Sequence, residues 1–429
     1  MFELTAAGCR EVIRKRNAEL RAVLHVLASP LSLAGDEKGP LDGVPFVLKD
    51  TWDTEGIPTT GGSWRHRDRV PARSSRVTRA LLDTGAVLLG KSNLCDLAFS
   101  PESDNHLIGA TQNPFDPTRT SGGSTGGGAA AVAAGMAGFD WGTDLGGSVR
   151  MPAGFCGVVG LRLSAAAWPV NEEHFPRVAP TFWPMLGMGP IARTVEDCRA
   201  IVRALRTTLR NALPAPTTRP DDVVIYGPDA KTTHAWPTFV GDAATALMGA
   251  GVRFEMDREL PSPFAVNELF NAYVCSHFRQ FADADELSIG EGTRAVLLGL
   301  ASRGKLDRRV HPNTGILFGL VALGSLTLYR NARRTDTQLA KLRDLSKAIW
   351  STGRLIVSPM ATLPPPKHGH AWREWTLQAF TKLGNLTDST AVAVPFGRFA
   401  NGLPRSIQIL GPPGSEEAVL DLAARLQRH

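Results

Sequence analysis

The sequence has little cysteine, no long apolar run and no recognisable export signal. Its 429 residues include five cysteines without a CxxC pair, which argues against a disulfide framework or a cysteine-ligated metal and favours reduced, structural thiols. No stretch approaches the roughly 18 consecutive apolar residues that a membrane-spanning helix requires. The N-terminus, MFELTAAGCREVIRKRN, is charged within a few residues and lacks the apolar centre of a signal peptide. These absences predict a cytoplasmic protein.

Charge of one sign is not concentrated anywhere in the chain. The net charge of +6 includes short basic clusters, such as residues 14–16, but no basic motif interleaved with aromatic residues. We therefore expect no nucleic-acid partner. A hydrophobic content of 43% is ordinary for a globular protein, and no charged or Pro/Ser-rich linker divides the chain. One α/β domain over residues 1–429 is the simplest expectation, as a monomer or homodimer.

Glycine and other small residues are concentrated between residues 119 and 162. Two glycine-flanked serines, Ser124 in GGST and Ser148 in GGSV, enclose an alanine-rich run. The run 127–136 predicts a tightly packed helix with Ser124 and Thr125 at its N-cap. Around Ser148, the sequence GTDLGGS allows backbone N–H groups to converge on one point, as an oxyanion hole requires. One glycine-serine string usually indicates a loop, but two strings flanking one helix favour a functional site.

These motifs resemble the signature region of the amidase signature family, hydrolases that use a Ser–Ser–Lys triad. The upstream lysine strand of that family, GVPxxxKD, is matched by GVPFVLKD at residues 43–50. Lys49, Ser124 and Ser148 follow one another in the order and with the separations typical of the family. The resemblance covers residues 40–200 and 350–429 well and the intervening residues poorly.

The resemblance implies a role for each matching residue. Ser148 would be the nucleophile, Ser124 would relay a proton next to a cis peptide bond with Gly123, and Lys49 would be the base. A lysine can act as a base only if burial lowers its pKa from about 10.4, and the apolar residues 44–48 provide such burial.

The residues around Ser148 receive supporting roles from the same resemblance. The expected oxyanion donors are the backbone N–H groups of Leu145, Gly146 and Gly147. Asp144 and Arg150 would form an orienting pair, and Thr143 would help to hold the lysine or the relay serine. No cofactor and no metal is expected.

Apolar periodicity predicts alternating helices and strands, and the resemblance implies the same fold: a large mixed, mostly parallel sheet covered by helices on both faces. Residues 40–200 would form the signature core with the catalytic residues. Residues 213–349 would form a variable, mostly helical region around the substrate pocket, and residues 350–429 would complete the sheet. Helices are expected at residues 4–27, 74–84, from 194, 380–387 and 415–427. Strands are expected at residues 44–48, 86–90, 157–161, 222–226, 355–360, 391–395 and 406–411.

A different class of enzyme remains open, because GGSTG at residues 122–126 matches the GxSxG nucleophile elbow of α/β-hydrolases. His368 or His370 would then supply the base of an esterase. The elbow needs a strand directly before its serine, whereas NPFDPTRTS predicts a turn. This alternative is therefore less favoured, and two histidines without a third ligand do not indicate a metal site.

Within the family, the alternative is a glutamine amidase like the A subunit of a tRNA-dependent amidotransferase. Two features argue against it. The N-terminal helical segment is shorter than is usual in the family, and residues 162–164 are Arg-Leu-Ser, where Lys-Pro-Thr is common. LPPPKHGH at residues 363–370 looks more like bacterial relatives of fatty acid amide hydrolase, a branch that includes urethane-cleaving amidases.

Residues 315–329 form a strongly apolar segment that bears on the substrate. The segment is too short to span a membrane and predicts a buried or pocket-capping helix in preference to a membrane-surface helix. We therefore expect a small amide, carbamate or ester substrate with an apolar or aromatic group.

Overall fold

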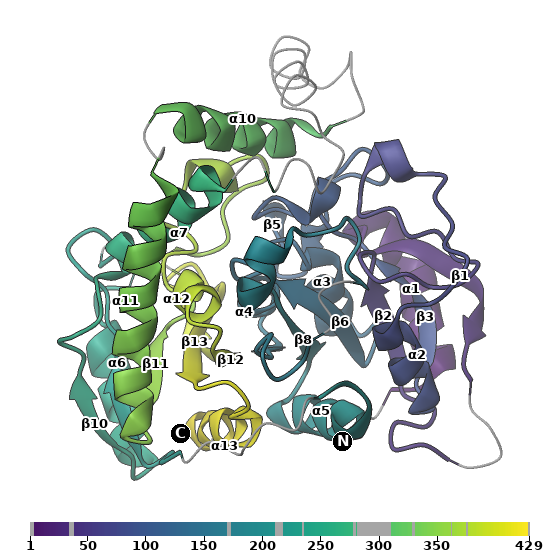
Figure 1. The fold of residues 1–429 in the computed structure, drawn as a ribbon. Coiled ribbons are helices and arrows are strands. Elements are labelled where there is room, and N and C mark those ends of the chain that lie inside the picture. Colours follow the sequence, from purple (N-terminus) through teal and green to yellow (C-terminus); the bar gives the residue numbers. More distant parts are fainter. Residues whose placement is uncertain are drawn as a thin grey trace.

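A central sheet of 11 strands, in the order β1-β3-β2-β6-β8-β7-β12-β13-β11-β9-β10, organises the computed structural model (Figure 1). The structure describes residues 4–33, 38–169, 173–210, 218–233, 236–277, 280, 310–327, 331–361, 363–374 and 376–427. The strands of the central sheet are β1 (Val23–Leu31), β2 (Pro45–Lys49), β3 (Val87–Ser92), β6 (Phe139–Asp144), β7 (Val159–Arg162), β8 (Gly187–Ala192), β9 (Asp222–Ile225), β10 (Arg253–Met256), β11 (Leu355–Pro359), β12 (Thr390–Arg398) and β13 (Pro404–Gly411).

The pairing of these strands confirms a mixed sheet. Parallel pairs join β3, β2 and β6 in one part of the sheet and β11, β9 and β10 at the opposite end. The strands between them, from β6 through β8, β7, β12 and β13 to β11, pair antiparallel. Antiparallel pairs are thus more numerous than expected. One reason is that the short connection 399–403 between β12 and β13 allows only an antiparallel hairpin.

Helices cover both faces of the sheet, as predicted. One face is covered by α2 (Arg76–Asp83), α5 (Val195–Leu209), α6 (Phe239–Gly249) and α13 (Glu416–Leu426). The other is covered by α1 (Ala6–Leu20), α3 (Gly126–Ala133), α4 (Arg150–Phe155), α11 (Ala332–Ser351) and α12 (Thr381–Leu386). On this second side, α7 (Pro263–Ser276) packs against α10 (Pro312–Thr327), α11 and α12 (Figure 1).

Because side chains alternate in direction along each strand, the apolar core is divided between the two faces of the sheet. In β11, Leu355 and Val357 pack in the cluster with α5 and α13, whereas Ile356 packs with α11 and α12. Successive side chains of a strand point to opposite faces, so a strand buried on both sides needs apolar residues at every position. This explains the uninterrupted apolar runs in the sequence.

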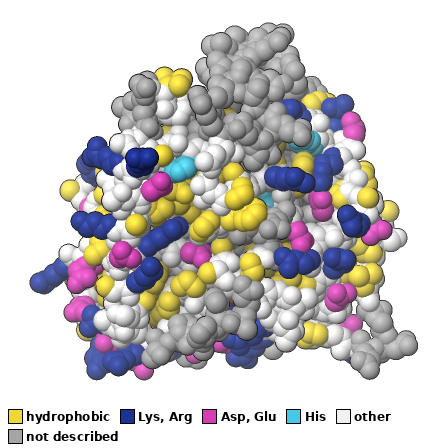
Figure 2. Space-filling model, in the orientation of Figure 1, with side chains coloured by type: hydrophobic (Ala, Val, Ile, Leu, Met, Phe, Trp, Pro, Cys, Tyr) yellow, Lys and Arg dark blue, Asp and Glu magenta, His cyan; other side chains and the backbone are white. Residues whose placement is uncertain are grey.

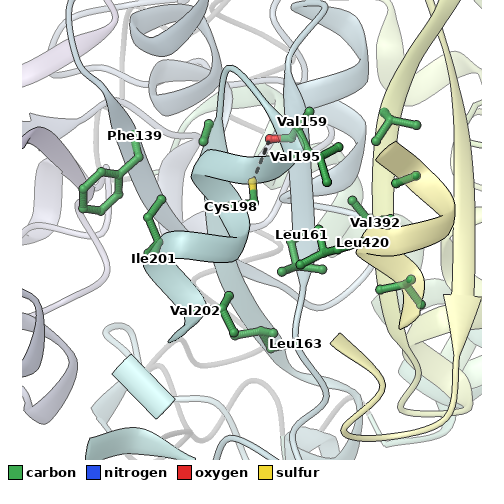
Figure 3. Packing of buried hydrophobic residues seen from close by; sticks show 14 of the residues in the cluster. Phe139, Val159, Leu161, Leu163, Val195, Cys198, Ile201, Val202, Val392 and Leu420 are labelled. Atoms are coloured by element: carbon green, nitrogen blue, oxygen red, sulfur yellow. Dashed lines mark hydrogen bonds between the residues drawn. The ribbon is translucent and has the colours of Figure 1, made fainter. Parts of the chain in front are cut away.

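The helix that begins after Thr194 shows how a sequence pattern becomes a packed layer. The Thr194 side chain accepts a hydrogen bond from the Asp197 N–H at 3.0 Å, which confirms the predicted cap of α5. Apolar positions three or four residues apart then line the side of the helix that packs on the sheet (Figure 3). The side chains that do so are Val195, Cys198, Ile201 and Val202.

The N-terminal segment differs from the expectation of one helix over residues 4–27. Helix α1 ends at Leu20, Arg21 has a φ of 51°, and β1 begins at Val23. Asn17 explains the change of direction, because its side-chain oxygen accepts hydrogen bonds from the N–H groups of Ala22 and Val23 at 3.0 and 2.8 Å. The chain therefore turns and continues as a strand beside β3.

The other expected elements lie within a few residues of the observed ones, with β7 beginning at Val159, two residues after the expected start. The region 213–349 holds β9, α6, β10, α7, α10 and most of α11 in its described part. Residues 211–217 and 281–309 lie outside the described residues. The division of the chain into three regions stays a prediction.

The close contact between α3 and β6 leads to a first prediction. Gly128 of α3 lies against the buried carboxyl group of Asp140, and a Cβ at this position would overlap with that group. Gly128→Ala should lower the free energy of unfolding by about 1–3 kcal/mol, because overpacking forces the neighbours apart. Urea unfolding monitored by circular dichroism measures this change.

Gly241→Ala is the matched control, because Gly241 lies in α6 and a Cβ there would meet no atom within 4 Å. This substitution should raise stability by about 0.5–1 kcal/mol through the higher helix propensity of alanine. Equal stability of the two variants would show that α3 does not need its close approach to β6.

Candidate active site

Lys49 lies at the carboxyl end of β2, a strand whose five residues are all buried. Its Nζ lies 2.7 Å from Ser124 Oγ, 2.8 Å from Thr143 Oγ1 and 3.3 Å from the Thr143 carbonyl oxygen. Burial lowers the pKa of Lys49 to about 8, although the carboxylates of Asp140 and Asp144 act in the opposite direction. An appreciable fraction of this amine is therefore neutral in mildly alkaline solution.

Ser124 follows a cis peptide bond with Gly123, as the resemblance implied. The N-cap of α3 is Thr125 alone, and its side chain makes no capping hydrogen bond, so the expected cap is only partly correct. Ser103, which sequence reasoning missed, takes over this role from outside the helix. Its Oγ accepts a hydrogen bond from the Gly126 N–H at 2.8 Å and donates one to the Ser124 carbonyl at 3.1 Å.

The loop that carries Ser148 is folded around the carboxylate of Asp144. This carboxylate accepts hydrogen bonds from the N–H groups of Gly147 and Val149 at 2.9 and 3.1 Å. Arg150 adds three more, from its backbone N–H at 3.3 Å, from Nε at 3.0 Å and from Nη2 at 2.8 Å. Ser148 sits between these anchored residues, half-buried and facing a cavity. Its position is therefore fixed by its neighbours.

The ion pair between Asp144 and Arg150 is fully buried, with no exposed surface on either side chain. Burial alone would raise the pKa of Asp144, but the guanidinium groups of Arg150 and Arg162 and the amide of Asn385 lower it well below its usual range. Arg150 also donates to the carbonyl of Thr381 at 2.8 Å. The predicted pair is present, and it ties the Ser148 loop to α12.

The three backbone N–H groups expected to bind an oxyanion differ in their availability. The Gly147 N–H donates to Asp144 Oδ1 at 2.9 Å, so this donor is already engaged, and its expected role towards an oxyanion stays a prediction. Within the described residues, the N–H groups of Leu145 and Gly146 donate to no protein acceptor. Both residues line the cavity beside Ser148. They keep the donors that an oxyanion hole requires.

The two serines are linked through the backbone and share one recess. The Thr125 N–H donates a hydrogen bond to the Ser148 carbonyl oxygen at 3.2 Å. Ser124, Ser148 and Thr143 all line the same small recess, which opens beside the larger cavity. The structure thus brings together the three residues that the motifs singled out, Lys49, Ser124 and Ser148.

His174 is a member of this cluster that sequence reasoning missed. Its Nε2 lies 3.2 Å from Thr143 Oγ1, and its Nδ1 lies 2.7 Å from the Pro176 carbonyl oxygen. Burial lowers the pKa of His174 to about 4, so the ring is neutral over the usual pH range. No local pattern in the sequence points to this histidine, because its contact with Thr143 is purely tertiary.

Lys91 is a second buried lysine, on the strand next to Lys49. It donates to the Trp52 carbonyl at 2.7 Å and to Thr59 Oγ1 at 2.9 Å, and its Nζ lies 3.3 Å from Asp50 Oδ1. Like Lys49, it directly follows an apolar run, which is the signal that could have identified it.

A cavity of about 610 Å³ opens in front of Ser148. Apolar side chains of α7 and α10 form a large part of its wall, among them Phe264, Phe270, Leu317, Leu320 and Val321, and segments 98–101 and 371–378 line it as well. The expected apolar segment 315–329 is therefore a pocket-lining helix over its described part, and residues 328 and 329 lie outside the described residues. Hydrophobic side chains also gather near the middle of the face shown in Figure 2, where charges of both signs are interspersed.

One wall of this apolar cavity carries a buried cation, Lys382 of α12. Its Nζ donates hydrogen bonds to Asn267 Oδ1 at 2.8 Å and to Asn271 Oδ1 at 2.9 Å. Burial lowers the pKa of Lys382 to about 7. Together with Glu268 and Glu374, which also line the cavity, this group interrupts the apolar lining, and the sequence pattern did not indicate it.

The nucleophile-elbow interpretation does not fit the geometry around Ser124. Strand β5 (Asp116–Thr120) precedes this serine where a turn was expected, but it forms a two-stranded sheet with β4 (Gln112–Asn113), outside the central sheet. In the described structure, the hydrogen bond of Ser124 Oγ joins it to Lys49 and not to a histidine. His368 Nε2 instead lies 3.2 Å from Gln112 Oε1.

Three broader features concern the described residues as a whole. All five cysteines are buried and free. No three His, Cys, Asp or Glu side chains are grouped as a metal site would need, within the part of the chain that the structure describes. Among the described helices, none combines the length and the apolar character needed to cross a membrane.

Comparison with known proteins agrees with this geometry. A family model described as Amidase matches residues 20–420. The A subunit of glutamyl-tRNA(Gln) amidotransferase from Heliobacterium modesticaldum is 40% identical, with 91% of this chain and 83% of the relative aligned. Putative amidase AmiB2 of Mycobacterium tuberculosis is 30% identical, with 95% of this chain and 86% of the relative aligned.

A solved structure supports the same fold. The crystal structure of a bacterial aryl acylamidase of the amidase signature family superposes with a TM-score of 0.74, covering 99% of this chain and 92% of the other at 20% identity. The match of the family model over nearly the whole chain, together with relatives of at least 30% identity, is decisive: the chain belongs to the amidase signature family of amide-hydrolysing enzymes.

Proposed function

We propose that this enzyme cleaves the C–N bond of an amide, anilide or carbamate through an acyl-enzyme on Ser148, with Ser124 as proton relay and Lys49 as base. The observation that carries the proposal is the 2.7 Å contact between Lys49 Nζ and Ser124 Oγ in a fully buried site. A lysine whose pKa is lowered by burial can accept a proton near its working pH. Through this contact, Lys49 can accept the proton of the Ser124 hydroxyl group.

In the proposed acylation step, Ser148 Oγ attacks the substrate carbonyl carbon. Its proton passes to Ser124 Oγ as the proton of Ser124 passes to Lys49, so the lysine becomes an ammonium. The N–H groups of Leu145 and Gly146 would stabilise the oxyanion. When the C–N bond breaks, the departing nitrogen takes a proton back from Lys49 through Ser124. Water then hydrolyses the acyl-enzyme by the same proton route.

Asp144 and Arg150 contribute to this mechanism by positioning and not by proton transfer. The carboxylate holds the loop from both sides of Ser148, and its lowered pKa keeps it charged at any working pH. A charged anchor maintains all of its hydrogen bonds as the pH changes. Thr143 supports the lysine directly through its hydroxyl and carbonyl groups.

The substrate class is inferred from the walls of the cavity. The described lining from α7 and α10 is mostly apolar, and the volume of about 610 Å³ is large enough for an aromatic or medium-chain acyl group. Such a group would remove apolar surface from water, at about 25 cal/mol per Å². We therefore infer a small-molecule substrate with a bulky hydrophobic group, including carbamates of the kind that urethanases cleave. Ester cleavage is inferred as a side activity of the same machinery.

A glutamine amidase is the second candidate, because a relative of 40% identity is the A subunit of an amidotransferase. The apolar side chains that line the described cavity favour a hydrophobic substrate over glutamine, although Glu268, Asn271 and Lys382 also line it, and this candidate is therefore the second one. Ammonia release from glutamine faster than turnover of a hydrophobic anilide would reverse this order.

The role of Ser148 is tested by its removal. Ser148→Ala should lower turnover of an aromatic p-nitroanilide by on the order of 10⁴-fold or more, because no oxygen remains to form the acyl-enzyme. A fluorophosphonate probe should label the native enzyme at Ser148, as read by mass spectrometry of the peptides. Labelling of Ser124 in Ser148→Ala would instead favour the nucleophile-elbow mechanism.

The role of Lys49 is tested by the dependence of kcat/KM on pH. Because burial lowers the pKa of Lys49 to about 8, the neutral form increases with pH, and kcat/KM should rise along a limb with its midpoint near this value. Lys49→Ala should remove the limb and lower amide turnover by roughly 10²–10⁴-fold. It should retain more activity on a matched ester, since an alkoxide leaving group needs less help from an acid. An unchanged limb in this variant would show that another group is the base.

The apolar wall predicts a preference that one substitution should weaken. Leu317 of α10 lines the cavity, so Leu317→Ala should raise KM for an octanoyl p-nitroanilide by about tenfold and leave the acetyl analogue unchanged. Leu326→Ala, at an exposed position of the same helix, is the matched control. Higher kcat/KM for the acetyl than for the octanoyl substrate in the native enzyme would contradict the inferred substrate class.

A further inference from the structure

We propose that His174 is a positioning residue that directs the lone pair of Lys49 at Ser124 by fixing the orientation of the Thr143 hydroxyl group. This inference rests on the proposed function, in which Lys49 is the base. It assigns a mechanistic role to a histidine that lies outside every sequence motif. A chain of hydrogen bonds runs from the Pro176 carbonyl through His174 and Thr143 to Lys49. Each of these hydrogen bonds determines where the hydrogen of the next one lies.

The contact with Pro176 determines which nitrogen of His174 carries the hydrogen. A carbonyl oxygen can only accept, so the 2.7 Å contact with the Pro176 carbonyl requires a hydrogen on Nδ1. The ring is neutral, because burial lowers the pKa of His174 to about 4. Nε2 therefore has a free lone pair, and it faces Thr143 Oγ1 at 3.2 Å.

This lone pair in turn determines the orientation of the Thr143 hydroxyl. A hydroxyl group has one hydrogen, and Nε2 of His174 can only accept it. Once this hydrogen points to His174, Oγ1 presents only lone pairs to Lys49 Nζ at 2.8 Å. Thr143 thus acts towards the lysine as a pure acceptor, through both Oγ1 and its carbonyl oxygen.

The two acceptors on Thr143 set the direction of the lysine lone pair. A neutral amine has two N–H groups and one lone pair, and Thr143 offers its acceptors at 2.8 and 3.3 Å. The remaining neighbour is Ser124 Oγ at 2.7 Å, so the lone pair points at the hydroxyl that must lose its proton. After proton transfer, the third N–H of the ammonium points at the same oxygen and can return the proton.

Removing the acceptor nitrogen of His174 would change both the direction of the Lys49 lone pair and the pKa of Lys49. The freed Thr143 hydroxyl could turn its hydrogen towards Nζ and compete with Ser124 for the lone pair. The ammonium would at the same time lose an acceptor, which favours the neutral amine and lowers its pKa. The other titratable groups that act on Lys49, namely Cys95, Asp140 and Asp144, would stay in place.

The experiment compares pH profiles of kcat/KM on one hydrophobic p-nitroanilide. His174→Phe keeps an aromatic ring against Trp52, which His174 contacts edge-on, but removes the acceptor. In this variant, the rising limb of kcat/KM should move to lower pH by about one unit. The plateau of kcat/KM at high pH should fall about tenfold. Both changes are expected from the loss of one hydrogen bond at the base. His174→Gln, whose side-chain oxygen can accept near the position of Nε2, should restore most of both quantities.

A double-mutant cycle tests whether His174 acts through Thr143. Thr143→Val has the same shape but no hydroxyl, and it should also lower the plateau about tenfold. The double variant with His174→Phe should then be no slower than Thr143→Val alone, because the two residues serve one function. Thr143→Val also carries the test if His174→Phe does not fold: an unchanged plateau and limb in Thr143→Val would overturn the proposal.

Separate controls distinguish failure of this inference from failure of the proposed function. His25→Leu removes another histidine whose pKa is lowered by burial, on edge strand β1, and it should leave the profile unchanged. If Lys49→Ala removes the limb but His174→Phe keeps both the limb and the plateau of the native enzyme, only the role of His174 is wrong. If Lys49→Ala keeps the limb, both proposals fall.

Discussion

The Asp144 carboxylate is the interaction on which the geometry of the site depends. It accepts hydrogen bonds from the backbone on either side of Ser148 and from the guanidinium group of Arg150, which in turn contacts α12 and β13. Because the pair is fully buried, removing one partner would leave an uncompensated charge, at a cost of about 3–5 kcal/mol. The end of β6, the serine loop and the start of α4 are thereby held as one unit.

Burial lowers the pKa of both lysines at the ends of neighbouring strands, but their hydrogen-bond partners differ. At Lys91, the Asp50 carboxylate, 3.3 Å from Nζ, opposes this shift. Lys49 has only hydroxyl and carbonyl oxygens as hydrogen-bond partners among the described residues. Neutral oxygens compensate less for lost water than a carboxylate does, so the amine at the Ser124 contact is the one best suited to accept a proton.

Much of the site could be predicted from the sequence, because its central residues lie in contiguous motifs with characteristic separations. Lys49, Ser124 and Ser148 were identified in this way, through a family resemblance and not through periodicity. His174 and Lys382 could not be, since each acquires its role from a contact between segments distant in the chain. The fold was predictable where strands are buried on both faces. The prediction of a helix was wrong at residues 21–27, where the side chain of Asn17 overrides a helical pattern.

The walls of the cavity and the reacting groups come from different parts of the chain. The serines and Lys49 belong to the strand ends and loops of residues 49–148, whereas α7 and α10 supply a large part of the apolar wall. Substitutions in these two helices can therefore reshape the cavity without disturbing the proton route. For enzyme engineering, this separation makes α7 and α10 the natural targets of a mutant library for new acyl groups, with the strand ends left constant. The same independence would allow substrate range to diverge during evolution faster than the chemistry.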